Sequence, residues 1–266
     1  MSSEEVKKEA EEGGKEKKVK RRLFVFGATS AIAIETCRVF AEEESEVEFY
    51  LVARNKERVE AVASDLRART EGVVKVYIYD LADISSHKKL IQELFNDCPK
   101  PTDAFLAWGY LGDNEAARHN FSEAEKIIKV NYLSAVSLLT LLAERFKDLS
   151  GSAISVITSV AGDRGRKRIY VYGSAKGALS RYLQGLRNYL FEHKVFVIEI
   201  KPGFVDTPMT SGMKKNFLFA SPQKVGRDIY KGIAKRKDLF YTPWFWRFIL
   251  LVIVHIPEKI FKRLNI

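Results

Sequence analysis

Short runs rich in β-branched residues alternate with longer amphipathic stretches along most of this chain, and this alternation limits its fold more than any other feature. In a parallel sheet, buried strands read as short apolar runs, and the connecting helices read as longer amphipathic segments. We therefore predict an α/β fold with a single doubly wound parallel sheet of about seven strands and helices on both faces. The predicted strands are residues 23–26, 47–52, 73–79, 104–108, 153–158, 195–200 and 239–242, and the predicted helices are 32–42, 56–70, 124–147 and one that contains Tyr172 and Lys176.

Composition divides the chain into three parts. Residues 1–22 are nearly all charged or small, and we predict a disordered tail because such a segment buries too little apolar surface to offset its ordering entropy. Residues 23–242 carry the alternating pattern, and a chain of 266 residues that is 46% hydrophobic is long enough to bury the core of one large domain. Residues 243–266 form an apolar and amphipathic C-terminal segment.

Cysteine, histidine and charge content narrow the class of protein. Cys37 and Cys98 provide neither a disulfide framework nor a zinc quartet, and no leading signal peptide is visible. The four histidines stand at no metal-ligand spacing, so we expect no metal site. The formal net charge of +10 suits phosphate ligands or an anionic membrane surface. We expect a cytoplasmic protein, with peripheral contact at the inner face of the plasma membrane left open.

Three residues have the spacing of a proton-transfer site. Tyr172 and Lys176 stand four apart, so on a helix they share one face, and Ser159 lies thirteen positions before the tyrosine. A phenol with its ordinary pKa of about 10 exchanges protons poorly at neutral pH, and a neighbouring ammonium group lowers that pKa. A serine from another segment then holds the substrate oxygen. Alone, a tyrosine–lysine pair at this spacing is weak evidence, and an ordinary helix surface is its commoner explanation.

The first predicted strand runs through a turn of small residues directly into a helix. Gly27 begins this turn, and Thr29, Ser30, Ala31 and Ile32 lead into the helix. Small residues let backbone N–H groups approach a pyrophosphate, and the helix N-terminus adds a favourable dipole, as in the Rossmann fold. The sequence therefore predicts a dinucleotide site here, although alanines stand where second and third glycines are usual.

Residues 23–242 resemble the short-chain dehydrogenase/reductase family, both in the motifs above and at several further positions. The matching positions are Asp80-Leu81 after the third strand, Asn131 in the long helix, and Pro202-Gly203 with Thr207 after the sixth strand. The resemblance implies an NAD(P)-dependent oxidoreductase that acts on CH–OH or C=O groups, and a homo-oligomer.

The resemblance also assigns roles to the matching residues. Tyr172 would be the general acid in the reducing direction, Lys176 would lower its pKa and bind the nicotinamide ribose, and Ser159 would hydrogen-bond the carbonyl. Asn131 would support a proton relay, Asp80 would contact the adenine, and Thr207 the nicotinamide amide. The expected cofactor contacts are Gly27, Thr29, Ser30, Ala31, Ile32, Arg54, Asp80, Leu81, Ala107, Gly109, Tyr172, Lys176, Pro202, Gly203, Val205 and Thr207.

The end of the second predicted strand selects the cofactor. An NAD-selective site places a carboxylate there to bind the ribose 2′-hydroxyl. Here Arg54 and Asn55 follow the strand, and Arg58 lies a turn further on. Because no carboxylate repels a 2′-phosphate and Arg54 pairs with one, we predict NADPH (NADP⁺) as the cofactor. The alternative is an arginine that only faces solvent.

Two departures from the family pattern point to a subgroup. The glycine turn is depleted, and Ala107-Trp108-Gly109-Tyr110 replaces Asn-Asn-Ala-Gly, which removes an asparagine that braces the sheet. Residues 27–30, 109–113, 172–176 and 255–266 resemble the decaprenylphosphoryl-2-keto-ribose reductases. That resemblance implies reduction of a 2-keto sugar on a polyprenyl phosphate during synthesis of an arabinose donor for cell walls, after a partner oxidase makes the ketone.

Two segments of the chain, and its function, each have more than one interpretation. The C-terminal segment either packs on the domain or a dimer partner, or docks at a membrane surface. The cations Arg164, Arg166, Lys167 and Arg168 either form a solvated loop or clamp a substrate phosphodiester. The rival functions are a membrane-associated reductase of lipid, steroid or polyketide ketones and a non-catalytic NADPH-binding regulator. We expect no nucleic-acid partner.

Overall fold

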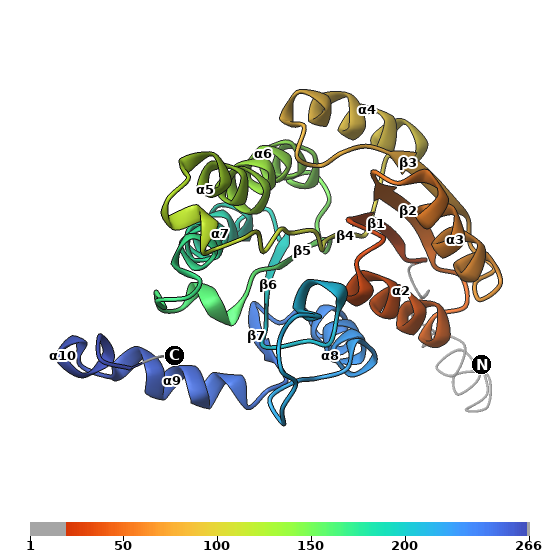
Figure 1. Ribbon diagram of the computed structural model, residues 1–266. Coiled ribbons are helices and arrows are strands. Elements are labelled where there is room, and N and C mark those ends of the chain that lie inside the picture. Colours follow the sequence, from red (N-terminus) through yellow and green to blue (C-terminus); the bar gives the residue numbers. More distant parts are fainter. Residues whose placement is uncertain (1–19, 265–266) are drawn as a thin grey trace, which may run out of the picture.

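A seven-stranded parallel sheet forms the centre of the protein (Figure 1), as predicted. The computed structural model describes residues 20–264. Its strand order is β3-β2-β1-β4-β5-β6-β7, and every neighbouring pair is parallel. The order reverses direction between β1 and β4, which is the point where ligands bind in doubly wound sheets. The strands are β1 (Arg22–Phe26), β2 (Glu48–Ala53), β3 (Val74–Ile78), β4 (Asp103–Leu106), β5 (Ala153–Ile157), β6 (Phe196–Pro202) and β7 (Leu239–Thr242).

Helices cover both faces of this sheet (Figure 1). One face packs against α2 (Ala31–Glu43), α3 (Lys56–Arg67) and α8 (Pro222–Ala234). The other packs against α4 (His87–Asp97), α6 (Ser134–Phe146) and α7 (Tyr170–Phe191), with α5 (Phe121–Ile128) preceding α6. The prediction omitted α4 and α8. Beyond β7, the short helices α9 (Trp246–His255) and α10 (Glu258–Phe261) extend from the body.

The core lies on both sides of the sheet because successive strand residues point to opposite faces. Phe24 and Phe26 of β1 pack beneath α4 and α6, whereas Leu23 and Val25 pack beneath α2 and α8. All four are fully buried. Fully burying such a side chain contributes about 1.5–3 kcal/mol, so the apolar runs that predicted the strands also supply the main packing energy.

Order begins before the predicted boundary at residue 22. Arg22 is the first residue of β1, and Arg21 forms ion pairs with Glu44 (2.9 Å) and the buried Asp103 (2.6 Å). The prediction of a disordered tail was therefore wrong for residues 20–22, because two carboxylates of the folded domain bind the Arg21 guanidinium. The rest of that predicted tail, residues 1–19, lies outside the described residues.

The long helix predicted over residues 124–147 has three parts. The α5 helix passes into a π-helical turn, Lys129–Leu133, and then into α6. Within residues 20–264, this combined helix, Phe121–Phe146, is the one long and apolar enough to cross a membrane. Leu138, Leu142 and Phe146 pack in the core against the sheet, so its apolar residues are explained by the fold.

Candidate active site

The predicted site residues gather at the carboxyl ends of the strands, around a cleft of about 680 Å³. The ends of β1 to β6 each contribute residues, because parallel strands present their carboxyl ends at one edge of the sheet. The cleft is lined by Arg54, Arg58, Lys126, Lys129 and Lys176 but by one carboxylate, Asp80, so its field favours phosphates. Of the predicted residues, its lining includes Gly27, Thr29, Ser30, Ala31, Ile32, Arg54, Asp80, Leu81, Ala107, Gly109, Ser159, Tyr172, Lys176, Pro202, Gly203, Val205 and Thr207.

The turn between β1 and α2 approaches the neighbouring strand end closely. Gly27 has φ = 81°, a left-handed conformation that favours glycine, and its N–H donates to the Val52 carbonyl at 2.9 Å. A Cβ on Gly27 would lie 2.8 Å from the Trp108 nitrogen, so no larger residue fits. Ser30 precedes α2 without a side-chain cap, and the first turn of α2 holds no acidic residue. The helix therefore directs uncapped N–H groups toward the cleft.

Ser159 and Tyr172 meet although they lie on different elements. Ser159 begins a 3₁₀ turn, Val160–Gly162, directly after β5, and its Oγ accepts a hydrogen bond from the Ala161 N–H at 3.0 Å. Tyr172 lies in the first turn of α7, with 8% of its surface exposed, and its hydroxyl group is near enough to Ser159 for the serine to oppose the rise of its pKa. The Tyr172 N–H donates to Asn114 Oδ1 at 3.3 Å. The two hydroxyl groups therefore share the inner end of the cleft.

Burial governs the acidity of Tyr172. Burial raises the pKa of this phenol to about 12, while the hydrogen bond with Ser159 acts in the opposite direction. The lowering of this pKa by Lys176 stays a prediction. The Lys176 Nζ lies 5.9 Å from the centre of the tyrosine ring. In this structure desolvation outweighs the opposing effect of Ser159 on the phenol. The phenol is consequently protonated at neutral pH.

Lys176 is a buried lysine one turn after the tyrosine. Its side chain is 3% exposed, and its Nζ donates to the Ile157 carbonyl at 3.2 Å. Burial lowers the pKa of this ammonium group to about 8, so it keeps its charge at neutral pH by a small margin. A positive charge held at the end of the cleft is poised to bind an oxygen-rich or anionic group.

Asn131 lies beside the cleft rather than on its lining. It sits in the π-helical turn, is 2% exposed, and its Nδ2 donates to the carbonyls of Ile127 (2.8 Å) and Tyr110 (2.6 Å). Its Oδ1 accepts from the Tyr110 N–H at 3.1 Å. Both amide hydrogens are thus bound to backbone, and Asn131 fixes the segment after β4. The π-helical turn, which no sequence pattern indicated, places the amide there.

Trp108 braces the sheet where the family pattern would have an asparagine. Its indole Nε1 donates to the Val130 carbonyl at 3.2 Å and to Ser134 Oγ at 3.1 Å, so it ties the end of β4 to the π-helical turn. Next to it, Gly109 faces Asn131 and Lys176, and a Cβ there would lie 3.0 Å from Asn131 Oδ1 and 3.6 Å from Lys176 Nζ. The departure at residues 107–110 therefore preserves a braced cleft by other contacts.

Two arginines stand at the end of β2. Arg54 is exposed on the cleft and has no ion-pair partner among residues 20–264. Arg58 Nη2 donates to the Thr29 carbonyl at 3.4 Å, which places its guanidinium beside the Gly27 turn. Asn55 caps α3 through the Arg58 N–H. A group bound at the turn would thus meet two guanidinium groups and no carboxylate at this position.

The cationic loop before Tyr172 is partly engaged in structure. Arg164 Nη1 donates to the carbonyls of Ile253 (2.5 Å) and Ile256 (2.6 Å), and its guanidinium lies 3.6 Å from the Phe261 ring centre. Arg166 Nη2 donates to the Val160 carbonyl at 2.8 Å. The alternatives of a solvated loop or a phosphate clamp were both wrong for Arg164, because this residue caps α9.

A buried polar network that the sequence did not reveal lies behind Ser159. Lys201 of β6 forms ion pairs with Asp163 and Glu199, and Glu199 accepts from the Thr158 hydroxyl at 2.9 Å. Tyr241 donates to Asp163 Oδ2 at 2.9 Å. The network joins β5, β6 and β7 to the loop that leads to Tyr172. Between residues 20 and 264, no group of histidine, cysteine or acidic side chains has the arrangement of a metal site.

Comparison with known proteins agrees with this geometry. The short chain dehydrogenase family model matches residues 21–217. An uncharacterized oxidoreductase of Mycobacterium tuberculosis is 32% identical over 242 residues, which cover 91% of this chain and 96% of the relative. A short-chain dehydrogenase from Sphingobium yanoikuyae in complex with NADPH superposes with a TM-score of 0.77 at 21% identity, over 90% of this chain and 97% of the other. A Burkholderia cenocepacia short chain dehydrogenase with NADP gives 0.78 at 18% identity, over 93% and 98%.

Proposed function

The chain belongs to the short-chain dehydrogenase/reductase family, and from this premise we propose that it is an NADPH-dependent ketone reductase. The observation that carries the proposal is the convergence of Ser159, Tyr172 and Lys176 at the inner end of a cationic cleft. Proton transfer and oxygen binding need these groups together in a site shielded from water. Loss of chemistry, as in a binding-only regulator, would leave no physical reason for this arrangement.

The residues present fit a dinucleotide. NADPH, when bound, supplies a hydride to the carbonyl carbon. Ser159 donates a hydrogen bond to the carbonyl oxygen, and Tyr172 transfers its phenolic proton to the same oxygen, so that the C=O group becomes a CH–OH group. The Lys176 ammonium stabilises the phenolate that Tyr172 becomes. The raised pKa of Tyr172 suits this direction, because the phenol starts protonated.

The β2 end supports NADPH as the cofactor. Arg54 and Arg58 line the cleft where a ribose 2′-phosphate would lie, and guanidinium groups match phosphate geometry. Asp80 lies on the same wall after β3, where the family places its adenine contact. Two structures of similar fold hold NADP or NADPH, which agrees with this assignment.

For the substrate, we propose the 2-keto sugar of a pentose linked to a polyprenyl phosphate. The supporting observations are the resemblance of residues 109–113 and 255–266 to reductases of that substrate, and exposed apolar residues on α9 near the active-site loop. Such a reaction belongs at the inner face of the plasma membrane, where NADPH is available, and it needs an oxidase that supplies the ketone. The rival within the same class is a reductase of other lipid ketones.

Oxidation of NADPH in the presence of a panel of ketones tests this function. The panel contains 2-keto-pentose phosphates with short and long prenyl chains, simple aliphatic ketones, and steroid and polyketide ketones. We expect turnover with keto-pentose phosphates that rises with prenyl length. Turnover limited to steroid or polyketide ketones would replace the proposed substrate. Tight NADPH binding without turnover of any ketone would replace the enzyme with a regulator.

A further inference from the structure

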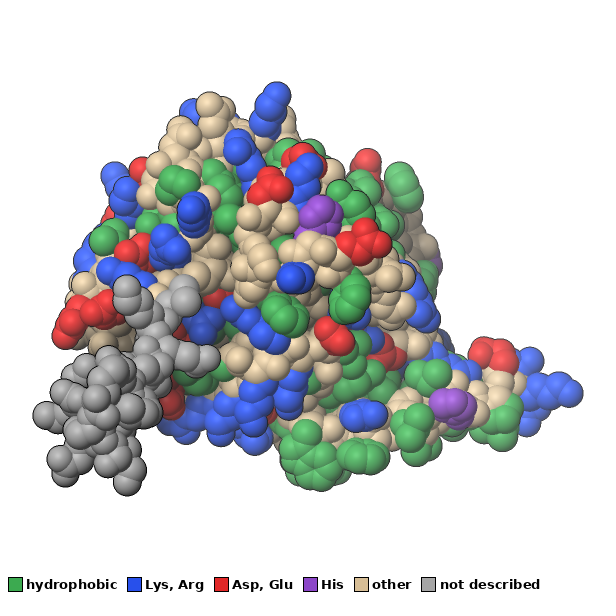
Figure 2. All heavy atoms as spheres, turned by 180° about the vertical axis from the view of Figure 1, so that it is seen from behind, with side chains coloured by type: hydrophobic (Ala, Val, Ile, Leu, Met, Phe, Trp, Pro, Cys, Tyr) green, Lys and Arg blue, Asp and Glu red, His purple; other side chains and the backbone are tan. Residues whose placement is uncertain are grey.

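Eight of the ten residues of the helix α9 are apolar, yet the domain covers only one side of the helix. Trp246 and Leu250 are buried against Val160 and Phe204. On its open side and at its start, the helix leaves large apolar side chains exposed, and Figure 2 shows hydrophobic side chains gathered along the lower edge of the molecule. They are Trp244 (68% exposed), Phe248 (57%), Leu251 (58%) and Val252 (66%). A contiguous exposed apolar surface of this kind marks a site that binds an apolar partner.

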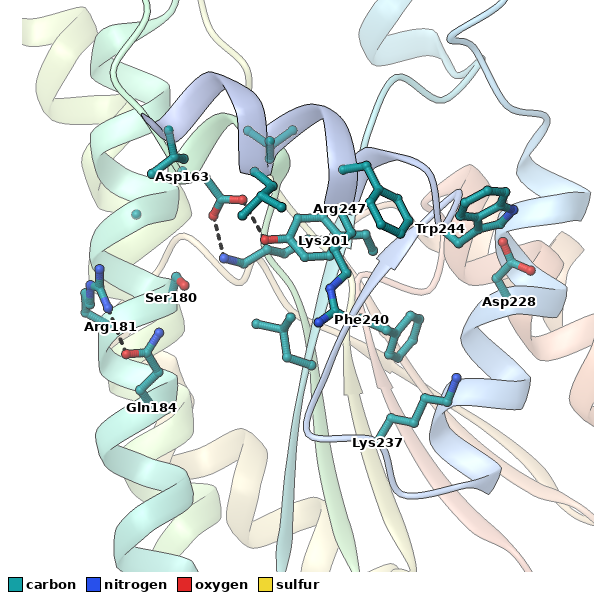
Figure 3. A pocket seen from close by; sticks show the side chains of 18 of the residues that line it. Asp163, Ser180, Arg181, Gln184, Lys201, Asp228, Lys237, Phe240, Trp244 and Arg247 are labelled. Atoms are coloured by element: carbon teal, nitrogen blue, oxygen red, sulfur yellow. Dashed lines mark hydrogen bonds and ion pairs between the residues drawn. The ribbon is translucent and has the colours of Figure 1, made fainter. Parts of the chain in front are cut away.

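The open side of α9 is one wall of a second, larger hollow, which we name the C-terminal groove. It has a volume of about 1210 Å³ and lies between α7, α8, β7 and α9 (Figure 3). Trp244, Phe248 and Leu251 line its apolar wall. Exposed cations line the rest, and none of them has an ion-pair partner among residues 20–264: Arg181, Lys231, Lys235, Lys237 and Arg247. Its two carboxylates, Asp163 and Asp228, are hydrogen bonded to Lys201 and Thr242.

We propose that this face docks on an anionic lipid bilayer, with the apolar side chains of α9 among the acyl chains and the groove cations at the headgroups. An amphipathic surface of this kind binds through its buried apolar area and through attraction to anionic lipids. The helix has ten residues, about 15 Å at 1.5 Å per residue, so it lies in the interface rather than crossing a bilayer.

The charges favour a membrane over a second copy of the chain. Two copies that met across their α9 helices would bring five unpaired cations of one groove toward five of the other. Like charges brought close together repel, and burial strengthens the repulsion. Further cations, Lys259, Lys262 and Arg263, follow on α10 and just beyond it. An anionic headgroup layer neutralises both sets at once.

The docking face is physically connected to the active site. Arg164, in the loop before Tyr172, binds the carbonyls at the C-terminal end of α9. At its other end, Trp246 lies against Gly203 of the cleft, where a Cβ would be 1.8 Å from the indole Nε1. A docked α9 therefore holds the loop and the end of β6 that border the catalytic residues. The docking inference does not depend on the proposed substrate.

Vesicle sedimentation of the full chain, without substrate, tests the inference. We expect binding to vesicles of phosphatidylglycerol and phosphatidylcholine, weaker binding at high salt, and none to phosphatidylcholine alone. Each cation near an anionic surface contributes about 1 kcal/mol, which is about fivefold, so Lys235→Gln with Lys237→Gln should weaken binding about 25-fold. Phe248→Gln with Leu251→Gln should weaken it at least about tenfold.

Matched control variants distinguish a loss of docking from the effects of a changed net charge or of misfolding. Lys88→Gln with Lys89→Gln on α4 removes the same charge, and Phe191→Gln removes an apolar side chain that is 77% exposed at the end of α7. These controls should bind as the parent does, and all variants should keep their circular dichroism and NADPH affinity. No binding of the parent to anionic vesicles would overturn the inference. Groove variants that bind vesicles as well as the controls do would also overturn it. The same holds if light scattering shows that Phe248→Gln with Leu251→Gln converts a dimer to monomers while vesicle binding is unchanged.

Discussion

At the scale of single residues, burial sets the chemistry of the candidate site. Tyr172 and Lys176 are both nearly inaccessible, and burial moves their pKa values in opposite directions, to about 12 and about 8. Each shift favours the uncharged form, as desolvation requires. The tyrosine is thereby kept as an acid, and the lysine keeps a charge that costs folding free energy. A charge held in this way is typical of functional sites.

The cost of that charge predicts how stability depends on pH. The ordinary pKa of lysine, 10.5, is lowered to about 8 in the folded protein, so between these values the unfolded chain binds more protons. The free energy of unfolding therefore rises as pH increases from about 8 to about 10.5, and below pH 8 the full penalty, about 3 kcal/mol, is present.

Replacing the lysine by methionine should remove this penalty. Lys176→Met should raise the free energy of unfolding of the cofactor-free protein at pH 7 by about 1–3 kcal/mol, less the lost hydrogen bond to Ile157. The advantage should shrink as pH approaches 10. Urea titrations at several pH values measure the gain in stability at pH 7 and its decrease at higher pH. The variant Lys224→Met, which changes an exposed lysine, is the control. A variant that is less stable than the parent at pH 7 would contradict the burial of a charged lysine.

At the scale of elements, the ends of β5, β6 and β7 are joined by a buried ionic network. Lys201, Asp163 and Glu199 have side-chain exposures of 7%, 9% and 0%, so the lysine neutralises two carboxylates that are largely shielded from water. Removing one member of a buried network leaves uncompensated charge, which costs more than the network itself contributes. The loop from Asp163 to Tyr172 is anchored here at one end and by Arg164 on α9 within it.

This anchoring predicts a large effect for one substitution. Lys201→Met should lower the free energy of unfolding by about 3–5 kcal/mol, because Glu199 and Asp163 lose their cation. Lys215→Met breaks an exposed pair with Asp206 (2.7 Å) and should cost less than about 1 kcal/mol. Denaturant unfolding of both variants measures the contrast. Equal effects would mean that the network is not isolated from water.

How much of these elements could be predicted depended on whether the determinants were local. The strands, the Gly27 turn and the tyrosine–lysine pair are set by neighbouring residues, so sequence patterns indicated them. The π-helical turn around Asn131, the indole of Trp108 and the Lys201 network depend on partners far away in sequence, and no local pattern indicated them. Arg164 shows the same limit, because its partners on α9 are about ninety residues distant.

At the scale of the whole molecule, two regions gather positive charge, and we propose a different ligand for each. The cleft at the strand ends carries five cations and one carboxylate, and the C-terminal groove carries exposed cations beside the apolar wall of α9. The Arg164 side chain and the Trp246–Gly203 contact connect the two regions. We assign cofactor choice to the first region and propose membrane docking for the second, and we expect variants of one region to leave the function of the other unchanged.

Cofactor choice should depend on Arg54. Arg54→Glu places a carboxylate where the 2′-phosphate of NADPH would lie, and the lost charge-assisted hydrogen bond should weaken NADPH binding at least about tenfold. NADH affinity should stay the same or improve. Fluorescence titration with both cofactors measures the ratio, and Lys88→Glu on α4 provides a charge-matched control. An equal loss of affinity for both cofactors would show that Arg54 faces solvent and does not bind the 2′-phosphate.

The central claim is that Tyr172 protonates a ketone while NADPH is bound nearby, and the variant Tyr172→Phe tests it most directly. This change removes the phenolic hydroxyl and keeps the ring that packs in the site. With the ketone that the parent reduces best, we predict that kcat falls at least about 10²-fold, whereas the Kd for NADPH, measured by fluorescence on the same preparation, stays within about twofold. A kcat within about tenfold of the parent, with NADPH affinity preserved, would contradict the account.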